Sequence, residues 1–264
     1  MGIDCRSAWA WAPPVGAVLL LVLVVASGSD QSLFLALNHF GKADATGLWV
    51  HLTVLGDGAV ALALVLPWIR RRPHCFWAAL VAAALVGLMV QGIKQVVSVP
   101  RPLGVFAAEH FFQAGPGYRA VSFPSGHAAT AFALAGIWIM TLPGYTLART
   151  LLLATAVLVS LSRIMVGVHW PLDVLTGAIA GWLAAITGLQ LACWRNWKTC
   201  SWAGFIAGLV LLGVAASLLM SQHIGIPAVL PLQRALGLLC LVLGAWEMFQ
   251  MLPRGMLRRQ PKGD

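Results

Sequence analysis

Long apolar runs with few interruptions divide this chain into eight segments. They cover residues 14–27, 52–69, 76–97, 126–142, 147–166, 171–193, 202–220 and 233–252, and they are rich in Ala, Leu and Val. A helix needs about 20 apolar residues to cross the hydrocarbon core of a bilayer, and most of the runs approach that length. A transmembrane β-barrel would instead show alternating segments of about ten residues. The pattern therefore predicts an all-α fold, a polytopic bundle of transmembrane helices.

The composition agrees with a membrane protein. Of the 264 residues, 60% are hydrophobic and 9% are charged, and the mean hydropathy is +0.86. So few charges cannot cover the surface of a water-soluble domain. The first run is short, and residues 26–28 are a candidate signal-peptide cleavage site. Only Arg6 supplies positive charge before it, so we favour an uncleaved first helix.

The distribution of basic residues predicts how the helices are oriented. Short loops rich in Lys and Arg usually face the cytoplasm. If the N-terminus is cytoplasmic, most of the 17 basic residues fall on that side, and the net charge of +9 requires no nucleic-acid partner. This cytoplasmic set is Arg6, Arg70, Arg71, Arg72, Arg149, Arg195, Lys198, Arg254, Arg258, Arg259 and Lys262. We therefore expect a multi-pass protein of the bacterial inner (cytoplasmic) membrane.

Three polar islands interrupt the apolar pattern, and all of them fall on the predicted periplasmic or exterior side. In the first island, Lys94 lies at the end of the third run and Arg101 follows between two prolines. Two cations this close to lipid are costly without an anion. A phosphate suits both, because Arg can fork onto two oxygens and Lys adds a point charge. Taken alone, the pair could also simply extend to the membrane surface.

The second island, residues 124–127, opens the fourth run. The unpaired N–H groups and the dipole of a helix N-terminus attract anions. Gly126 lets an oxyanion approach the backbone, and Ser125 can either cap the helix or donate to a phosphate oxygen. His127 lies in the first turn.

The third island, residues 162–173, adds Arg163 to the candidate phosphate ligands. His169 and Asp173 are four residues apart, so they meet on one face if the sixth helix begins near residue 170. A carboxylate that holds one imidazole nitrogen leaves the other free to act as a nucleophile or base. We consider His169 the best candidate nucleophile in the chain.

Together the islands read KxxxxxxRP, PSGH and SRxxxGxHxxxD, with every specified position matched between residues 94 and 173. This set resembles the signature of the type 2 phosphatidic acid phosphatase (PAP2) superfamily, in its membrane lipid phosphatase branch. The resemblance implies a six-helix core, which we assign to residues 1–193. Residues 194–264 would then add two transmembrane helices and a basic cytoplasmic tail.

The resemblance also implies a metal-independent lipid phosphatase without a cofactor. By analogy, His169 attacks phosphorus, Asp173 orients it, and His127 protonates the leaving oxygen. The implied phosphate-binding residues are Lys94, Arg101, Ser125, Gly126 and Arg163. The substrate would be a lipid in the bilayer: undecaprenyl diphosphate, phosphatidylglycerophosphate, phosphatidic acid or lipid A phosphate. Two alternatives stay open, a phosphotransferase that uses a polyprenyl diphosphate and a non-catalytic lipid or ion transporter, and so does the oligomeric state.

Outside the islands, the sequence supports simpler interpretations. Asp57 is flanked by glycines and is better read as a helix cap than as a catalytic carboxylate. We expect residues 28–51 to be a solvated connection. Residues 103–123 form the longest outer loop, whose phenylalanines could enter the headgroup layer or pack as a lid. The last two runs should pack on the outside of the bundle.

Overall fold

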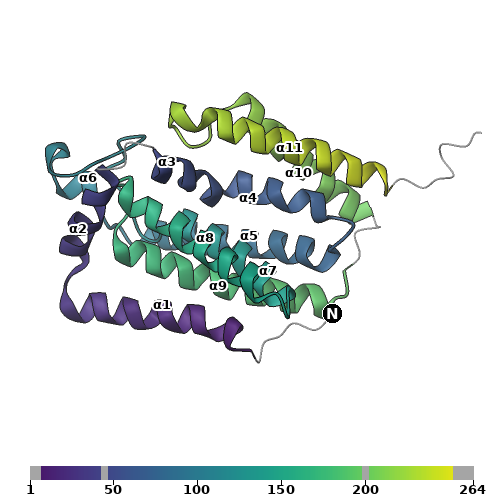
Figure 1. The fold of residues 1–264 in the computed structure, drawn as a ribbon, viewed down its shortest axis with the longest axis horizontal. Coiled ribbons are helices and arrows are strands. Elements are labelled where there is room, and N and C mark those ends of the chain that lie inside the picture. Colours follow the sequence, from purple (N-terminus) through teal and green to yellow (C-terminus); the bar gives the residue numbers. More distant parts are fainter. Residues whose placement is uncertain (1–6, 43–46, 198–201, 252–264) are drawn as a thin grey trace, which may run out of the picture.

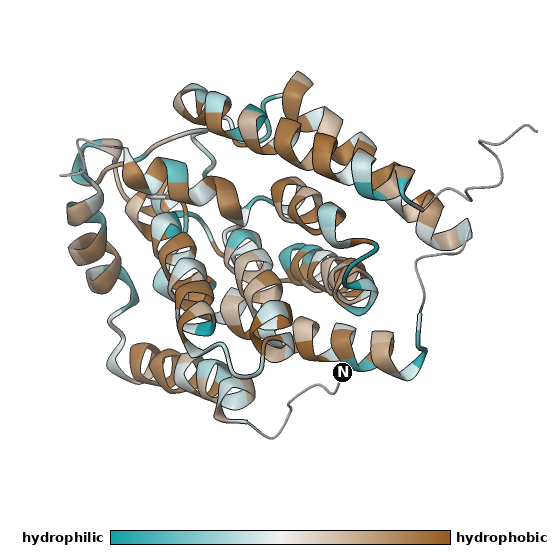
Figure 2. Ribbon diagram, turned by 45° about the vertical axis from the view of Figure 1, so that its right-hand side comes forward, coloured by the Kyte–Doolittle hydropathy of each residue, from teal (hydrophilic) through white to brown (hydrophobic). Residues whose placement is uncertain are grey.

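The computed structural model describes residues 7–42, 47–197 and 202–251. These residues form helices and connecting turns without a strand, which confirms the all-α prediction (Figure 1). Hydrophobic residues run along most of the helices, as a membrane-embedded bundle requires (Figure 2). Six helical segments are long and apolar enough to cross a membrane. They are α1 (Ala8–Ser27), α5 (Pro73–Val96), α8 (Thr146–Met165), α9 (Pro171–Trp194), α10 (Trp202–Met220) and α11 (Leu230–Phe249), which follows the 3-10 turn η4 (Pro227–Val229).

Two of the eight apolar runs depart from a simple transmembrane helix. The second is broken into α3 (Leu48–Leu52) with η1 (Thr53–Gly56), then α4 (Gly58–Val65) with η2 (Leu66–Trp68), and the two halves are bent by 64°. Asp57 stands at the break, where its Oδ1 accepts hydrogen bonds from the N–H groups of Ala59 and Val60 at 2.9 and 3.1 Å. The predicted helix cap is confirmed. The fourth run forms α7 (Gly126–Thr141), which has only 16 residues.

The expectation of a solvated connection at residues 28–51 is wrong for residues 30–42. This region contains α2 (Asp30–Lys42), which buries Phe34 and Asn38 against the rest of the bundle. A Cβ atom at Gly41 would collide with the carbonyl oxygen of Met165, so α2 lies directly on the end of α8. Phe34 and Asn38 lie on the face of α2 that packs against the bundle. The polar residues on its other face had suggested a loop.

Phe106 and Phe111, within residues 103–123, pack against aromatic rings of the protein. This stretch contains α6 (Pro102–Val105) and η3 (Ala108–His110). The ring of Phe111 lies 5.4 Å from that of Phe34, and Phe34 lies 5.0 Å from Trp170. The cluster therefore fastens α2 and this loop to the start of α9. Together they form one end of the bundle, at the left of Figure 1, which we call the site end.

Small residues on α9 let three helices approach closely at the centre of the bundle. Gly177 and Gly181 are one turn apart, and a Cβ at either would collide with a backbone oxygen of Ser125 or Ala129 near the start of α7. A Cβ at Gly188 would likewise press on α5. Such small-residue contacts favour backbone packing between membrane helices. They bring the N-terminus of α7, in the second island, beside that of α9, where the third island ends.

The last two helices pack on the outside of the bundle, beside α4, as expected (Figure 1). Glu247 of α11 is buried, and its two carboxylate oxygens accept hydrogen bonds from Nε of Arg70 at 2.9 Å and from Nε of Arg71 at 2.7 Å. These bonds fasten α11 to the turn that follows η2, at the end of the bundle opposite the site end. Arg70 and Arg71 therefore bind a carboxylate of α11, in addition to any part they have in orienting the helices in the membrane.

Candidate active site

The turn between α8 and α9 holds His169 in a fixed position. Gly167 has a positive φ of 76°, and a Cβ there would collide with the carbonyl oxygen of Phe112, so glycine is required. The carbonyl oxygen of Arg163 accepts hydrogen bonds from the N–H groups of Val168 at 3.1 Å and His169 at 3.3 Å. The last turn of α8 and the turn that follows it therefore hold a cation and a histidine of the third island close together.

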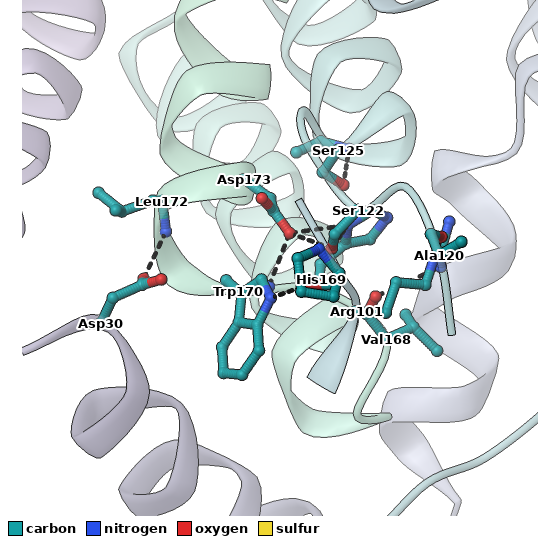
Figure 3. A network of polar contacts seen from close by, with 12 residues as sticks. Asp30, Arg101, Ala120, Ser122, Ser125, Val168, His169, Trp170, Leu172 and Asp173 are labelled. Carbon is teal, nitrogen blue, oxygen red and sulfur yellow. Dashed lines mark hydrogen bonds and ion pairs between the residues drawn. The ribbon is translucent and has the colours of Figure 1, made fainter. Parts of the chain in front are cut away.

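His169 and Asp173 meet as their spacing predicts, and both are buried. His169 Nδ1 lies 3.2 Å from Asp173 Oδ2 (Figure 3). The same oxygen accepts hydrogen bonds from Trp170 N at 2.9 Å and from the hydroxyl of Ser122. Ser122 Oγ also lies 3.3 Å from His169 Nδ1. These contacts fix the imidazole through Nδ1, which leaves Nε2 for chemistry when Nδ1 carries the proton.

Burial and positive charge keep the His169 imidazole neutral. Desolvation lowers the pKa of His169 well below its ordinary value, and the positive charges of Arg163, Arg101 and Lys94 lower it further. All three predicted cations therefore act on this one histidine. A neutral imidazole is the form that can attack phosphorus.

The N-terminus of α7 contributes the second island. Ser125 caps this helix, because its Oγ accepts a hydrogen bond from Ala128 N at 3.4 Å. Its own N–H donates to the carbonyl oxygen of Asp173 at 3.0 Å, which joins the starts of α7 and α9. Gly126 and His127 follow in the first turn. His127 Nε2 is buried and has no hydrogen-bond partner among the described residues.

The three cations are held in different ways. Arg101 donates from Nη1 to Val168 O and from Nε to Ala120 O, both at 3.3 Å, and its guanidinium lies 5.2 Å from the centre of the Tyr118 ring. Burial lowers the pKa of Arg101, and the negative charge of Asp173 opposes that effect. Lys94 is half-buried in the last turn of α5.

Arg163 is buried, and its Nη1 donates to Thr53 Oγ1 of η1. Its Nε has no partner among the described residues. The bend in the second span therefore places the Thr53 hydroxyl next to Nη1 of the guanidinium. The Nε–H group of Arg163 remains without an acceptor in the described part of the chain. A bound anion could accept a hydrogen bond from it.

Four polar residues near the site were not predicted from the sequence. Ser122 bonds Asp173, and Thr53 bonds Arg163. Asn38 accepts from Phe112 N at 2.7 Å, and it donates to the carbonyl oxygens of Phe112, Ile164 and Met165 at 2.9, 2.9 and 3.1 Å. Asp30 accepts from Leu172 N at 3.0 Å, and burial raises the pKa of this carboxyl group. None belongs to a spaced motif, and all act from segments that the sequence suggested to be connections or spans.

Within residues 7–42, 47–197 and 202–251, no group of three or more His, Cys, Asp or Glu residues could hold a metal ion. The groups of this site that could bind an anion are the three cations and the first turn of α7. Their arrangement suits a phosphate whose oxygens need several donors at once.

Comparison with known proteins identifies the family. The family model of the PAP2 superfamily matches residues 75–200, a range that includes all the predicted site residues. An undecaprenyl-diphosphatase of Sulfolobus acidocaldarius is 33% identical over 158 residues, which span 59% of this chain and 73% of that protein. This chain belongs to the PAP2 superfamily. The resemblance predicted from the three islands is confirmed.

Other PAP2 proteins show the same relationship. A lipid A 1-phosphatase of Rhizobium etli is 33% identical over 113 residues, or 40% of this chain and 46% of that protein. The crystal structure of Aquifex aeolicus LpxE superposes with a TM-score of 0.53 and 28% identity, covering 61% of this chain and 94% of that one. The transmembrane PAP2 type phosphatidylglycerolphosphate phosphatase of Bacillus subtilis shares the fold, with a TM-score of 0.52 at 22% identity and coverages of 68% and 95%. Family, relatives and apolar helices together support a PAP2 membrane lipid phosphatase.

Proposed function

We propose that this PAP2 protein hydrolyses a phosphate monoester or diphosphate of a membrane lipid through a phosphohistidine at His169, without a metal ion. One observation carries the proposal: Gly126 and His127 of the site also line a largely apolar groove. The groove has a volume of about 310 Å³ and is lined by His127 and Gly126 at one end and by apolar residues of α4, α5 and α7 beyond them. A lipid could place its phosphate among the cations and its tail in this groove.

The dimensions of the groove agree with a lipid tail. Its lining residues on α5 extend from Gln91 to Ala79, and those on α7 from Gly126 to Ile137. At 1.5 Å per helical residue, these stretches are about 16–18 Å long. The hydrocarbon core of a bilayer is about 30 Å thick, so the groove reaches roughly to its middle. A water-soluble phosphate ester would not need such a groove.

In the proposed reaction, His169 Nε2 attacks phosphorus in line with the bond to the leaving oxygen. The new bond is N–P, and the bond that breaks is P–O. Asp173 and Ser122 hold Nδ1 during the attack. The leaving oxygen takes a proton from His127 Nε2, which acts as the general acid of this step. Water then cleaves the N–P bond, with His127 as the base, and releases inorganic phosphate.

Positive charge holds the phosphate oxygens as charge develops on them. Lys94, Arg101 and Arg163 supply three cations, and the N–H groups at the start of α7 supply backbone donors. The Ser125 hydroxyl accepts a hydrogen bond from Ala128 N, so its proton is free to point to an oxygen of the substrate. Gly126 keeps this side of the pocket open. These groups take the place that a metal ion has in many phosphoryl-transfer enzymes.

A phosphate-release screen tests the proposal and identifies the substrate. The relatives act on undecaprenyl diphosphate and lipid A phosphate by name, so these lipids are assayed beside phosphatidylglycerophosphate and phosphatidic acid. The wild type should release phosphate from at least one lipid. His169→Ala should abolish release, whereas His110→Ala, which changes an exposed histidine of η3, should not. Full activity in His169→Ala, or no release from any of the four lipids, would contradict the proposal.

The same screen separates the alternatives. With an acceptor lipid present, a phosphotransferase would move labelled phosphate to that lipid instead of releasing it to water. A transporter would bind the lipids without releasing phosphate and would not need both His127 and His169. We also propose that residues 1–193 form the catalytic core, because the described part of α10 and α11 contributes no side chain to the site.

We propose that the site lies on the periplasmic or exterior side of the bacterial inner membrane. Arg70, Arg71, Arg149 and Arg195 lie at the opposite end of the bundle, where basic residues usually face the cytoplasm. Single cysteines at the exposed positions Glu109 and Arg195 test this orientation. A membrane-impermeant thiol reagent added to intact cells should label Glu109→Cys and not Arg195→Cys. Labelling of Arg195→Cys alone would reverse the orientation.

A further inference from the structure

A second apolar groove lies on the opposite side of the bundle from the proposed tail groove. It runs between α1, α7, α8 and α9 and has a volume of about 540 Å³. The side chains that line it from α1 and α8 include Trp9, Pro13, Gly16, Leu153, Val157 and Leu161. A Cβ atom added at Gly16 would meet no other atom within 4 Å, so the groove is open there. From Trp9 to Leu20 it is about 16 Å long, which is roughly half of the hydrocarbon core.

A buried, unsatisfied arginine stands at the end of this groove that is remote from the site. Arg149 belongs to the first turn of α8 and is 5% exposed. Its Nε and Nη2 atoms have no hydrogen-bond partner among the described residues. Its guanidinium carbon lies 5.8 Å from the centre of the Trp9 ring, and Trp9 itself lines the groove. The charge and the apolar groove are therefore joined through one side chain.

No described carboxylate neutralises Arg149. Asp30, Asp57 and Asp173 lie at the site end, Glu109 is exposed there in η3, and Glu247 is bonded to Arg70 and Arg71. A buried guanidinium with unused N–H groups costs free energy unless an anion reaches it. A phosphate fits, because a guanidinium can donate to two phosphate oxygens at once. Trp9 adds an aromatic ring of the kind that is enriched at membrane interfaces.

We propose that Arg149 and this groove bind one anionic phospholipid of the leaflet remote from the active site. The phosphate accepts hydrogen bonds from Arg149 Nε and Nη2 beside Trp9, and one acyl chain lies along α1 and α8 as far as Leu20. The groove itself continues to Leu161, Val174 and Leu175 near the site end, so a chain that begins beside Arg149 lies wholly within it. This lipid is not the substrate, since Arg149 and His169 lie near opposite ends of the bundle. The lipid site does not depend on the proposed phosphatase reaction.

Native mass spectrometry of the full-length protein tests this site. The protein is transferred to detergent, mixed with phosphatidylglycerol or phosphatidylcholine, and analysed for retained lipid. The wild type should retain one phosphatidylglycerol more than Arg149→Gln, and it should prefer this lipid over zwitterionic phosphatidylcholine. Loss of a charge-assisted pair should weaken retention at least about tenfold. Gly16→Leu, which fills the groove and keeps Arg149, should also weaken retention and provides a second route if Arg149→Gln does not fold.

Matched controls separate a site from general effects of charge and size. Arg195→Gln removes an exposed cation that stacks on Trp194 near the same end of the bundle, and it should retain lipid as the wild type does. Gly213→Leu adds the same side chain to α10, where a Cβ meets nothing within 4 Å, and should also have no effect. Phosphate release should persist in Arg149→Gln and Gly16→Leu.

Three results would overturn the proposal. The first is equal phosphatidylglycerol retention by the wild type, Arg149→Gln and Gly16→Leu. The second is a dimer that Gly16→Leu dissociates, which would make the groove a contact between copies. The third concerns Asp4, a carboxylate outside the described residues. If Asp4→Asn and Arg149→Gln change the thermal stability non-additively in the absence of lipid, then Arg149 pairs with Asp4 and not with a lipid phosphate.

Discussion

Replacing Thr53 by valine tests whether the bend in the second span positions a phosphate-binding cation. Thr53 is fully buried in η1, and its Oγ1 accepts a hydrogen bond from Arg163 Nη1. Among the described residues, no other side chain is hydrogen-bonded to this guanidinium. Valine has a similar size but removes the acceptor. Arg163 would then keep its charge and lose the contact that orients it.

The expected effect follows from the strength of that contact. A hydrogen bond to a charged group contributes about 1.5–3 kcal/mol. If the transition state depends on the position of Arg163, this amount appears in kcat/KM. Since about 1.36 kcal/mol corresponds to a tenfold change in rate, Thr53→Val should lower kcat/KM by roughly 10- to 150-fold. Thr53→Ser restores the hydroxyl and should recover most of the loss.

The assay is steady-state phosphate release with the most active lipid of the screen. Thr187→Val is the matched control, because the Thr187 hydroxyl only donates to Leu183 O within α9 and is exposed. In an Arg163→Gln background, Thr53→Val should cause less than about a twofold further loss. The reasoning would be refuted if Thr53→Val stayed within about twofold of the wild type. An equal loss in both backgrounds would refute it as well.

Four further predictions concern the site. Asn38→Ala removes four hydrogen bonds and should lower the free energy of unfolding by roughly 2–4 kcal/mol, which is measured as a lower thermal transition temperature. The control Gln31→Ala, on the exposed face of α2, should leave the transition unchanged. Because the pKa of His169 is lowered, the acidic limb of the kcat/KM profile should lie below pH ~6.5, and a limb above that value would contradict a neutral nucleophile. The same shift should reduce stability as pH falls below ~6.5, because the unfolded chain binds that proton more tightly. Excess EDTA should leave phosphate release unchanged, and a loss that added metal restores would overturn the metal-free mechanism.

The sequence predicted the features that depend on local spacing. Apolar length gave the helices, and the four-residue spacing of His169 and Asp173 gave their contact. The Asp57 cap followed from its flanking glycines. The 64° bend beside it did not, because an apolar run of sufficient length looks like one straight helix.

The missed contacts join segments that are far apart in the chain. Asn38 bonds residues 74 to 127 positions away, and Thr53 bonds a residue 110 positions away. Their side chains are common in loops and helices, so residue type gave no signal. Ser122 lies only three residues before Ser125, but the loop path that turns it to Asp173 is set by tertiary contacts, such as the bond from Ser122 N to Val99 O at 2.7 Å.

The most direct test of the central claim is to trap the covalent intermediate. The enzyme is mixed with a lipid labelled in the cleaved phosphate, quenched within the first turnover, and mapped for bound label. The account predicts a burst of label that is stable to alkali and labile to acid, located on His169 and absent from His169→Ala. Rapid turnover of the lipid with no label on His169, or wild-type phosphate release by His169→Ala, would contradict it.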